Sequence, residues 1–129
     1  MLKTGILNPA INELLSRVRH TNTLVIADRG FPYWPMIETV DISLIDGIST
    51  VLQVFSAIQP NFNIGQIYMA QEFLDVNPPS VVDQYRAAFG GIPVTHEPHP
   101  ALKQRVPGAI GLIRTGDTIQ YANMILGSA

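Results

Sequence analysis

Residues 23–30 are TLVIADRG, a short apolar run that ends in an acidic residue, an arginine and a glycine. An apolar run rich in β-formers and free of polar alternation is typical of a strand buried on both faces, and the residues after it indicate a turn. On the N-terminal side, Asn8 and Pro9 form a helix start signal, a capping side chain followed by proline. Apolar residues then recur at i, i+3, i+4 and i+7, which predicts a helix to about His20 that leads into the strand.

The same alternation continues toward the C-terminus. Its pattern predicts strands at 40–44, 66–70, 92–95, 109–114 and 119–126, helices at 51–58 and 81–89, and a short helix or turn at 98–106. Two prolines within residues 31–37 predict a loop there. Gly116 and Asp117 suit the turn of a hairpin between the last two strands. We therefore expect an α/β fold: a single domain over residues 1–129 with a mostly parallel sheet, flanking helices and an antiparallel C-terminal strand pair.

Composition excludes several classes of protein. The 129 residues include 8 Lys and Arg against 10 Asp and Glu, so the clustered basic excess of a nucleic-acid-binding protein is missing. There is no cysteine, and therefore no disulfide framework or thiolate metal site. Only 14% of residues are charged, against about 25% in a typical soluble domain, which indicates a surface partly covered by other subunits. No apolar run suits a membrane span or a signal peptide, so we expect cytoplasmic residence.

Polar residues follow several of the predicted strands. In open parallel sheets ligands bind beyond the carboxyl ends of the strands, so these residues are the first candidates for a site. They are Asp28 after the first strand, Gln71 and Glu72 after residues 66–70, and His96 and His99 after residues 92–95. Simpler roles remain open: Asp28 as a turn former, and both histidines as exposed loop residues.

Tyr121 and Asn123 are two residues apart in a predicted strand and so share one face. A phenol and an amide side by side suit sugar hydroxyls, since each group can donate and accept hydrogen bonds. Near the other end of the sequence, His20 is expected in the last turn of the first helix, where it would cap the carbonyls. The aromatic residues Phe31, Tyr33 and Trp34 suit a sugar face or, more readily, a subunit interface.

Motifs for other chemistries are missing. The sequence has no GxGxxG or GxxxxGK[ST] phosphate cradle, no HExxH metal spacing and no GxSxG nucleophile elbow. We therefore expect neither a metal site nor a bound cofactor.

Four stretches carry a resemblance to a known family. They are GILN (5–8), HTNTLVIADRGFP (20–32), MAQE with the following NP (69–78) and RTGDTIQYANMIL (114–126). Together they resemble the D-ribose pyranase and L-fucose mutarotase family over nearly the whole chain, most specifically in the terminal TG-acid-x-x-x-Y-x-N pattern. The resemblance implies a small cofactor-free α/β protein that assembles as rings of five, often stacked into ten, with sites at subunit boundaries.

The resemblance also implies roles for particular residues. His20 matches the family's catalytic histidine, and Asp28, Tyr121 and Asn123 match its sugar-binding residues. For the second histidine, an ungapped count back from Arg114 selects His99, whereas the string Thr95-His96-Glu97 imitates the family's His-Glu pair; we prefer His99. Departures from the pattern are Asp117 in place of glutamate, Gln71 in place of a second acid, and Pro100.

The implied reaction interconverts the pyranose and furanose forms of free D-ribose by proton transfers alone. Histidine suits this role because its pKa, near 6.5 when unperturbed, leaves both forms accessible at neutral pH. Asp28 would hold a sugar hydroxyl or orient His20. The alternatives are an L-fucose mutarotase and a non-catalytic, sugar-binding partner of a sugar transporter.

Overall fold

The computed structural model describes all residues 1–129, and it contains one mixed sheet with helices on both faces. The strands are β1 (Thr23–Ala27), β2 (Glu38–Asp41), β3 (Ile64–Ala70), β4 (Val94–Glu97), β5 (Gly111–Arg114) and β6 (Met124–Ser128). The helices are α1 (Pro9–Arg17), α2 (Val51–Ile58), α3 (Gln71–Val76), α4 (Pro79–Phe89) and α5 (His99–Arg105). Short 3₁₀ turns follow α2 at Gln59–Asn61 and α5 at Val106–Gly108.

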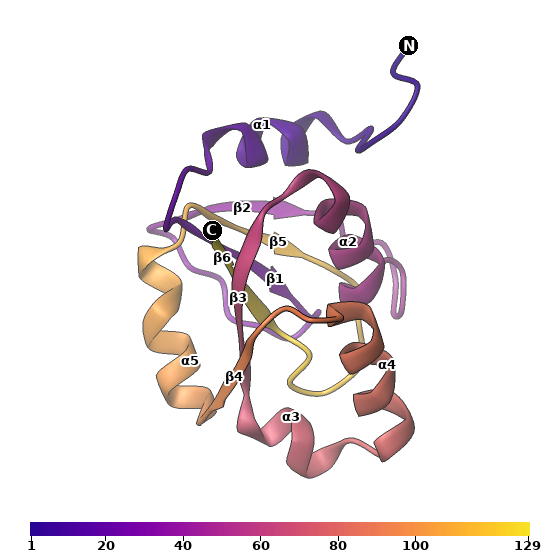
Figure 1. Cartoon of the computed structure of the whole chain (residues 1–129), viewed down its shortest axis with the longest axis vertical. Helices are drawn as coiled ribbons and strands as arrows, with labels where there is room; N and C mark the ends of the chain where they lie inside the picture. Colours follow the sequence, from indigo (N-terminus) through magenta and orange to yellow (C-terminus); the bar gives the residue numbers. More distant parts are fainter.

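The six strands lie in the order β2-β5-β1-β6-β3-β4. β1 pairs in parallel with β5, β5 with β2, and β3 with β4, whereas β6 is antiparallel to both of its neighbours, β1 and β3. Five strands therefore end at the same edge of the sheet, and β6 begins there. Figure 1 shows β6 and β1 in the middle of the molecule, with helices on either side.

Alternation along β1 divides the core into two layers. Leu24 and Ile26 point to one face of the sheet, where they join the buried apolar residues of α1, α2, α3 and α4. Val25 and Ala27 point to the other face, where α5 supplies Leu102. The apolar run of β1 is thus buried on both sides, as the sequence predicts. One face is covered by four helices, and the other by α5 with the 3₁₀ turn after it and Phe31 of the loop after β1 (Figure 1).

The first helix starts where the sequence predicts and ends earlier. The Asn8 side chain accepts a hydrogen bond from the backbone N–H of Ile11 at 3.1 Å, which caps the helix. Val18 is already extended, with ψ 131°, so α1 stops at Arg17. The expectation that His20 lies in the last helical turn is therefore wrong.

The α/β class and the order of the main elements are confirmed, but the C-terminal hairpin is wrong. β5 and β6 are both neighbours of β1, on opposite sides, and do not pair with each other. Residues 115–123 do not form a hairpin turn between β5 and β6; they carry the chain across the end of β1, so β6 enters the sheet between β1 and β3. The sequence correctly predicted that the last strand is antiparallel to its neighbours, but it predicted the wrong partner strand.

Element boundaries differ in smaller ways. The strand expected at 40–44 forms at Glu38–Asp41, and the strand expected at 119–126 forms at Met124–Ser128. Helix α3 was not predicted from the sequence. None of the helices combines the length and the apolar character that crossing a membrane requires.

Candidate functional site

A pocket of about 390 Å³ lies at the carboxyl edge of the sheet, beside the end of β1 and the start of β6. Its volume falls within the range of about 300–1,000 Å³ that is usual for small-molecule sites. The residues that line it come from three segments: the loop after β1, the start of α5 and the loop before β6. They are Asp28, Gly30, Phe31, Pro32, His99, Gln120, Tyr121 and Asn123.

Asp28 and Asn123 are joined at the floor of this pocket. The Asn123 side-chain oxygen accepts a hydrogen bond from the Asp28 backbone N–H at 2.7 Å, and Asn123 is only 3% exposed. The Asp28 carboxylate accepts from the Gly30 backbone N–H at 2.9 Å, which fixes the turn after β1. Burial raises the pKa of Asp28, although hydrogen bonds from Gly30 and Asn123 oppose this shift. The result is a partly buried carboxyl group beside a fixed amide.

His99 forms another wall of the pocket. Its backbone N–H donates to both carboxylate oxygens of Glu72, at 3.0 and 3.1 Å, which fixes the start of α5. Its ring lies edge-on to Tyr121, with centroids 5.0 Å apart, and 6.1 Å from Phe31. The ring nitrogen Nε2 is buried and has no hydrogen-bond partner. Burial, followed by the charge of Lys103, lowers the pKa of His99, so its imidazole is neutral at pH 7.

Tyr121 enters the pocket from a strained turn rather than from a strand. Its φ is +57°, in the left-handed region that residues other than glycine rarely adopt. Because β6 begins only at Met124, the expectation that Tyr121 and Asn123 share the face of a strand is wrong. Both side chains nevertheless line the pocket. Strain of this kind costs about 1–3 kcal/mol and persists only where its surroundings enforce it.

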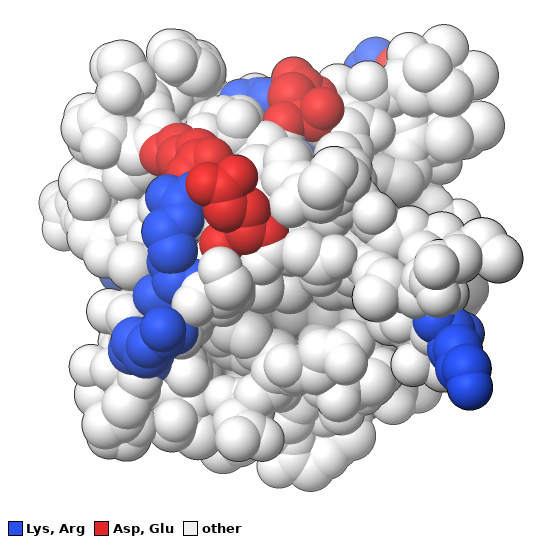
Figure 2. Space-filling model, turned by 90° about the horizontal axis from the view of Figure 1, so that it is seen from above, with Lys and Arg blue, Asp and Glu red and all other residues white.

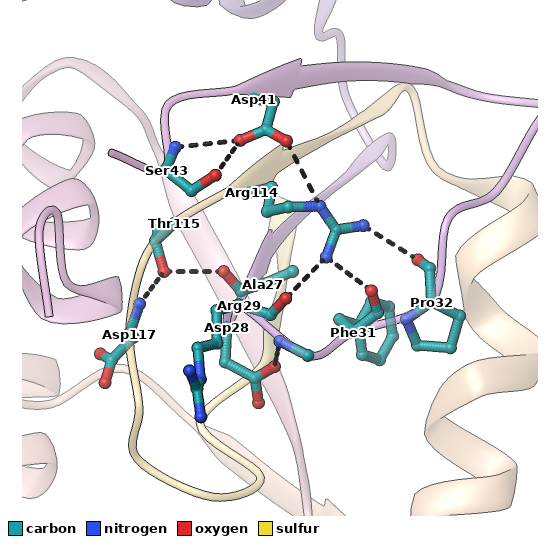
Figure 3. A network of polar contacts seen from close by, with 11 residues as sticks. Ala27, Asp28, Arg29, Phe31, Pro32, Asp41, Ser43, Arg114, Thr115 and Asp117 are labelled. Carbon is teal, nitrogen blue, oxygen red and sulfur yellow. Dashed lines mark hydrogen bonds and ion pairs between the residues drawn. The ribbon is translucent and has the colours of Figure 1, made fainter. Parts of the chain in front are cut away.

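Two buried polar residues hold the loop that carries Tyr121. Thr115 donates its hydroxyl to the Ala27 carbonyl at 2.8 Å, at the end of β1 (Figure 3). Asp117, 2% exposed, accepts hydrogen bonds from the backbone N–H groups of Val51 and Ile119 at 2.8 and 2.9 Å. Since Val51 is the first residue of α2, the Asp117 carboxylate also caps that helix. Asp117, which stands where the family pattern has glutamate, thus supports the loop from outside the pocket lining.

The two remaining candidate histidines lie elsewhere. His96, on β4, lines a different and mostly apolar cavity with Phe89 and Arg86, so the structure brings His99 and not His96 beside Asp28. His20 is exposed and precedes β1, whereas the pocket follows it. With a rise of about 3.3 Å per residue, the strand separates His20 from Asp28 by more than about 15 Å. Within one chain, His20 is therefore apart from the pocket.

Several lining residues were not found by reading the sequence. Gly30, Pro32 and Gln120 carry no distinctive chemistry, and Phe31 was expected chiefly at an interface, yet it is 5% exposed and lines the pocket. Proximity to Asp28 and Tyr121 along the chain was the only available signal. No group of three or more His, Cys, Asp or Glu side chains is arranged to hold a metal ion.

The arrangement suits a small polyhydroxy ligand. A carboxyl group, a neutral imidazole, a phenol and an amide provide several hydrogen-bond donors and acceptors, and the rings of Phe31 and Tyr121 provide apolar surface. The fold and the pocket together define a small α/β protein with a ligand site at the carboxyl edge of its sheet. The chain belongs to the RbsD / FucU transport protein family, whose model matches residues 1–129.

Individual relatives cover the full chain. A D-ribose pyranase of Geobacillus kaustophilus is 41% identical over 128 residues, which are 99% of this chain and 93% of the relative. Among solved structures, Bacillus subtilis RbsD complexed with D-ribose is 26% identical, covers 100% of this chain and 98% of its own, and has a TM-score of 0.91. A Streptococcus pneumoniae fucose mutarotase in complex with L-fucose shares the fold, with a TM-score of 0.84 at 19% identity, covering 99% of this chain and 98% of its own.

Proposed function

We propose that this protein is a D-ribose pyranase that interconverts the pyranose and furanose forms of free D-ribose. The observation that carries the proposal is the convergence of Asp28, His99, Tyr121 and Asn123 on one pocket. These are the residues that the family resemblance implies for sugar binding. The Geobacillus kaustophilus D-ribose pyranase and the ribose-bound Bacillus subtilis structure support the choice of sugar.

The reaction needs only proton transfers. A general acid gives a proton to the ring oxygen as the bond from the anomeric carbon to that oxygen breaks, and a general base takes the proton of the anomeric hydroxyl. The open aldehyde then closes through another hydroxyl, and the protons return. His20 is the residue assigned to proton transfer, while the pocket residues hold the hydroxyls. A positioned acid or base typically contributes about 10²–10⁴-fold to the rate.

His20 must reach the pocket from a neighbouring copy of the chain. Its exposed side chain at the opposite edge of the sheet is free to enter another subunit's pocket. Large apolar side chains stand exposed near the ends of several loops; they include Tyr33, Met36, Leu44 and Ile45. In Figure 2 a few acidic and basic side chains lie next to one another and most of that face is uncharged. These features support an oligomer with its sites at subunit boundaries. The family resemblance implies a pentamer or decamer.

Replacing His20 by alanine tests the proposal. NMR exchange spectroscopy on D-ribose should show the wild-type protein accelerating exchange between ring forms and the His20→Ala variant losing about 10²-fold or more of that acceleration. Sedimentation should show the same oligomer for both proteins. Undiminished exchange in the variant would remove His20 from its role.

The family's description as a transport protein family favours one second candidate, a sugar-binding partner of a transporter. Wild-type protein that binds ribose without accelerating exchange would support this candidate. Faster exchange on L-fucose than on D-ribose would instead indicate the mutarotase. Cytoplasmic residence stays a prediction from the sequence.

A further inference from the structure

Arg114 makes contacts with the pocket that the reaction does not explain. It is the last residue of β5, and its side chain is only 13% exposed. Its guanidinium group donates to the backbone carbonyl of Phe31 at 2.5 Å, to that of Pro32 at 3.3 Å and to that of Arg29 at 3.5 Å. Figure 3 shows the guanidinium group pointing at these three carbonyls.

The segment held in this way is one wall of the pocket. Gly30, Phe31 and Pro32 all line it, and proline at 32 keeps this segment out of a β-ladder. No other group of the protein donates to the carbonyls of Phe31 and Pro32. The position of the wall therefore depends on a side chain that does not itself line the pocket.

A carboxylate lies on the other side of the guanidinium group. The Asp41 carboxylate lies 3.8 Å from Arg114 Nε and accepts hydrogen bonds from the backbone N–H and hydroxyl of Ser43 (Figure 3). A planar guanidinium group can face a carboxylate with one edge and donate hydrogen bonds to several carbonyls from another. Lysine, with a single ammonium group, cannot span the same set. The chemistry of arginine thus matches this position.

We propose that Arg114 is a positioning residue: it fixes the wall formed by residues 30–32 and thereby sets the affinity of the pocket for its monosaccharide. This inference rests on the proposed function as far as the sugar is concerned. Its structural half, the fixing of the loop, can be measured without any sugar. Trp34 makes this possible, because it is the only tryptophan of the chain and its ring centroid lies 6.2 Å from that of Phe31.

The test compares Arg114→Met and Arg114→Lys with the wild type. Arg114→Met should raise KM for ribose-form exchange about tenfold, since displacing a binding wall by a fraction of an ångström weakens several hydrogen bonds together. The value of kcat should change less than about threefold, because Arg114 acts on a binding wall and the proposed proton-transfer residue, His20, would come from another chain. Trp34 emission without sugar should shift to longer wavelength. Arg114→Lys should bring both KM and Trp34 emission part of the way back to the wild-type values. It serves as the test protein if Arg114→Met does not fold.

Arg86→Met is the matched control, because Arg86 is an exposed arginine of α4 whose nearest carboxylate, Asp83, is 3.8 Å away. It should leave KM and Trp34 emission unchanged. A wild-type KM in Arg114→Met would overturn the positioning role, whether or not the emission shifts. A wild-type protein that neither binds nor isomerises ribose would instead overturn the proposed function. If Arg114→Met then also left Trp34 emission unshifted, the proposal that Arg114 fixes the loop would be overturned as well.

Discussion

The partly buried carboxyl group of Asp28 lowers the free energy of unfolding by an amount that depends on pH. Burial raises its pKa above the ordinary value of 3.8, so the folded chain keeps a proton that the unfolded chain has already released. The free energy of unfolding therefore falls as the pH rises from about 3.8 through the folded pKa. Above the folded pKa the protein carries this loss in full, a common feature of binding sites.

We expect Asp28→Asn to be more stable and less active than the wild type at pH 7. The amide oxygen of asparagine can still accept from the Gly30 N–H, and residue 28 no longer carries a charge. Thermal unfolding should occur about 2–5 °C higher at pH 7, and this difference should disappear below about pH 3.8. Ribose exchange should fall at least about tenfold. A variant less stable than the wild type at pH 7 would contradict the cost assigned to this carboxyl group.

His99 shows the opposite dependence on pH. Its pKa is lowered from 6.5, so as the pH falls below 6.5 the unfolded chain binds a proton that the folded chain does not, and stability is lost. The NMR titration of the His99 ring should have its midpoint below 6.5. Between pH 7 and pH 5, His99→Gln should lose less stability than the wild type in urea unfolding. Parallel losses in the two proteins would show that the ring is not buried enough to matter.

At the scale of residues, the sequence predicted much of the candidate site. Asp28 could be found because it follows a buried strand, and Tyr121 and Asn123 because a phenol and an amide lie close together. The left-handed turn at Tyr121 could not be found, since nothing local to a tyrosine indicates a φ of +57°. His99 was preferred to His96 by an ungapped count back from Arg114, because the strand pattern alone could not separate them: β4 ends at Glu97, and sequence patterns locate such a boundary only within a few residues.

At the scale of elements, α2 is tied to the rest of the fold through its first turn. The Thr50 side chain accepts from the Gln53 N–H at 3.1 Å, and Gln53 bonds back to the Thr50 N–H, a capping box. Asp117, 66 residues further along the chain, accepts from the Val51 N–H. The buried end of this helix thus depends on one local cap and one distant carboxylate.

The two caps should differ in strength. Asp117→Ala leaves one buried and one partly buried N–H group without a partner and should lower the free energy of unfolding by about 2–4 kcal/mol. Thr50→Ala, which removes the more exposed cap, should cost about 1 kcal/mol. Urea unfolding of both variants measures the difference. Equal losses would show that Asp117 does no more than a surface cap.

Close backbone packing explains why the last connection was mispredicted. A Cβ atom on Gly116 would lie 2.5 Å from the Ile48 carbonyl oxygen, so this glycine allows the loops at 45–48 and 115–117 to touch. Read alone, Gly116 and Asp117 indicate a hairpin turn. In the fold, both residues contact residues 45–51, which are distant in the sequence and which a local pattern cannot indicate. The buried strand at 23–27 was predicted correctly because its signal is entirely local.

At the scale of the whole molecule, a single chain does not contain the complete proposed site. His20 and the pocket lie at opposite edges of one sheet. The low fraction of charged residues, 14%, predicts covered surface but does not say which face is covered or by how many copies. The assembly remains a prediction.

Mixed assemblies test whether sites are shared. Asp28→Asn removes the pocket carboxylate and His20→Ala removes the histidine, so each variant alone should be nearly inactive. When the two are co-expressed in equal amounts, about a quarter of the sites should combine an intact histidine with an intact pocket from a neighbour. The mixture should recover about that fraction of the wild-type exchange rate. No recovery, in mixed oligomers verified by mass, would contradict a shared site.

The central place of β6 has a consequence for biosynthesis. Ile125 pairs with Val25 on one side and with Tyr68 on the other, so residues 124–128 join two strand groups that otherwise do not meet. Until these residues leave the ribosome, β1 and β3 each present an open edge to other nascent chains. We expect stalled chains that lack residues 124–128 to be digested rapidly by protease and full-length chains to resist it. The two strand groups are thus joined into one sheet only when β6 inserts between β1 and β3.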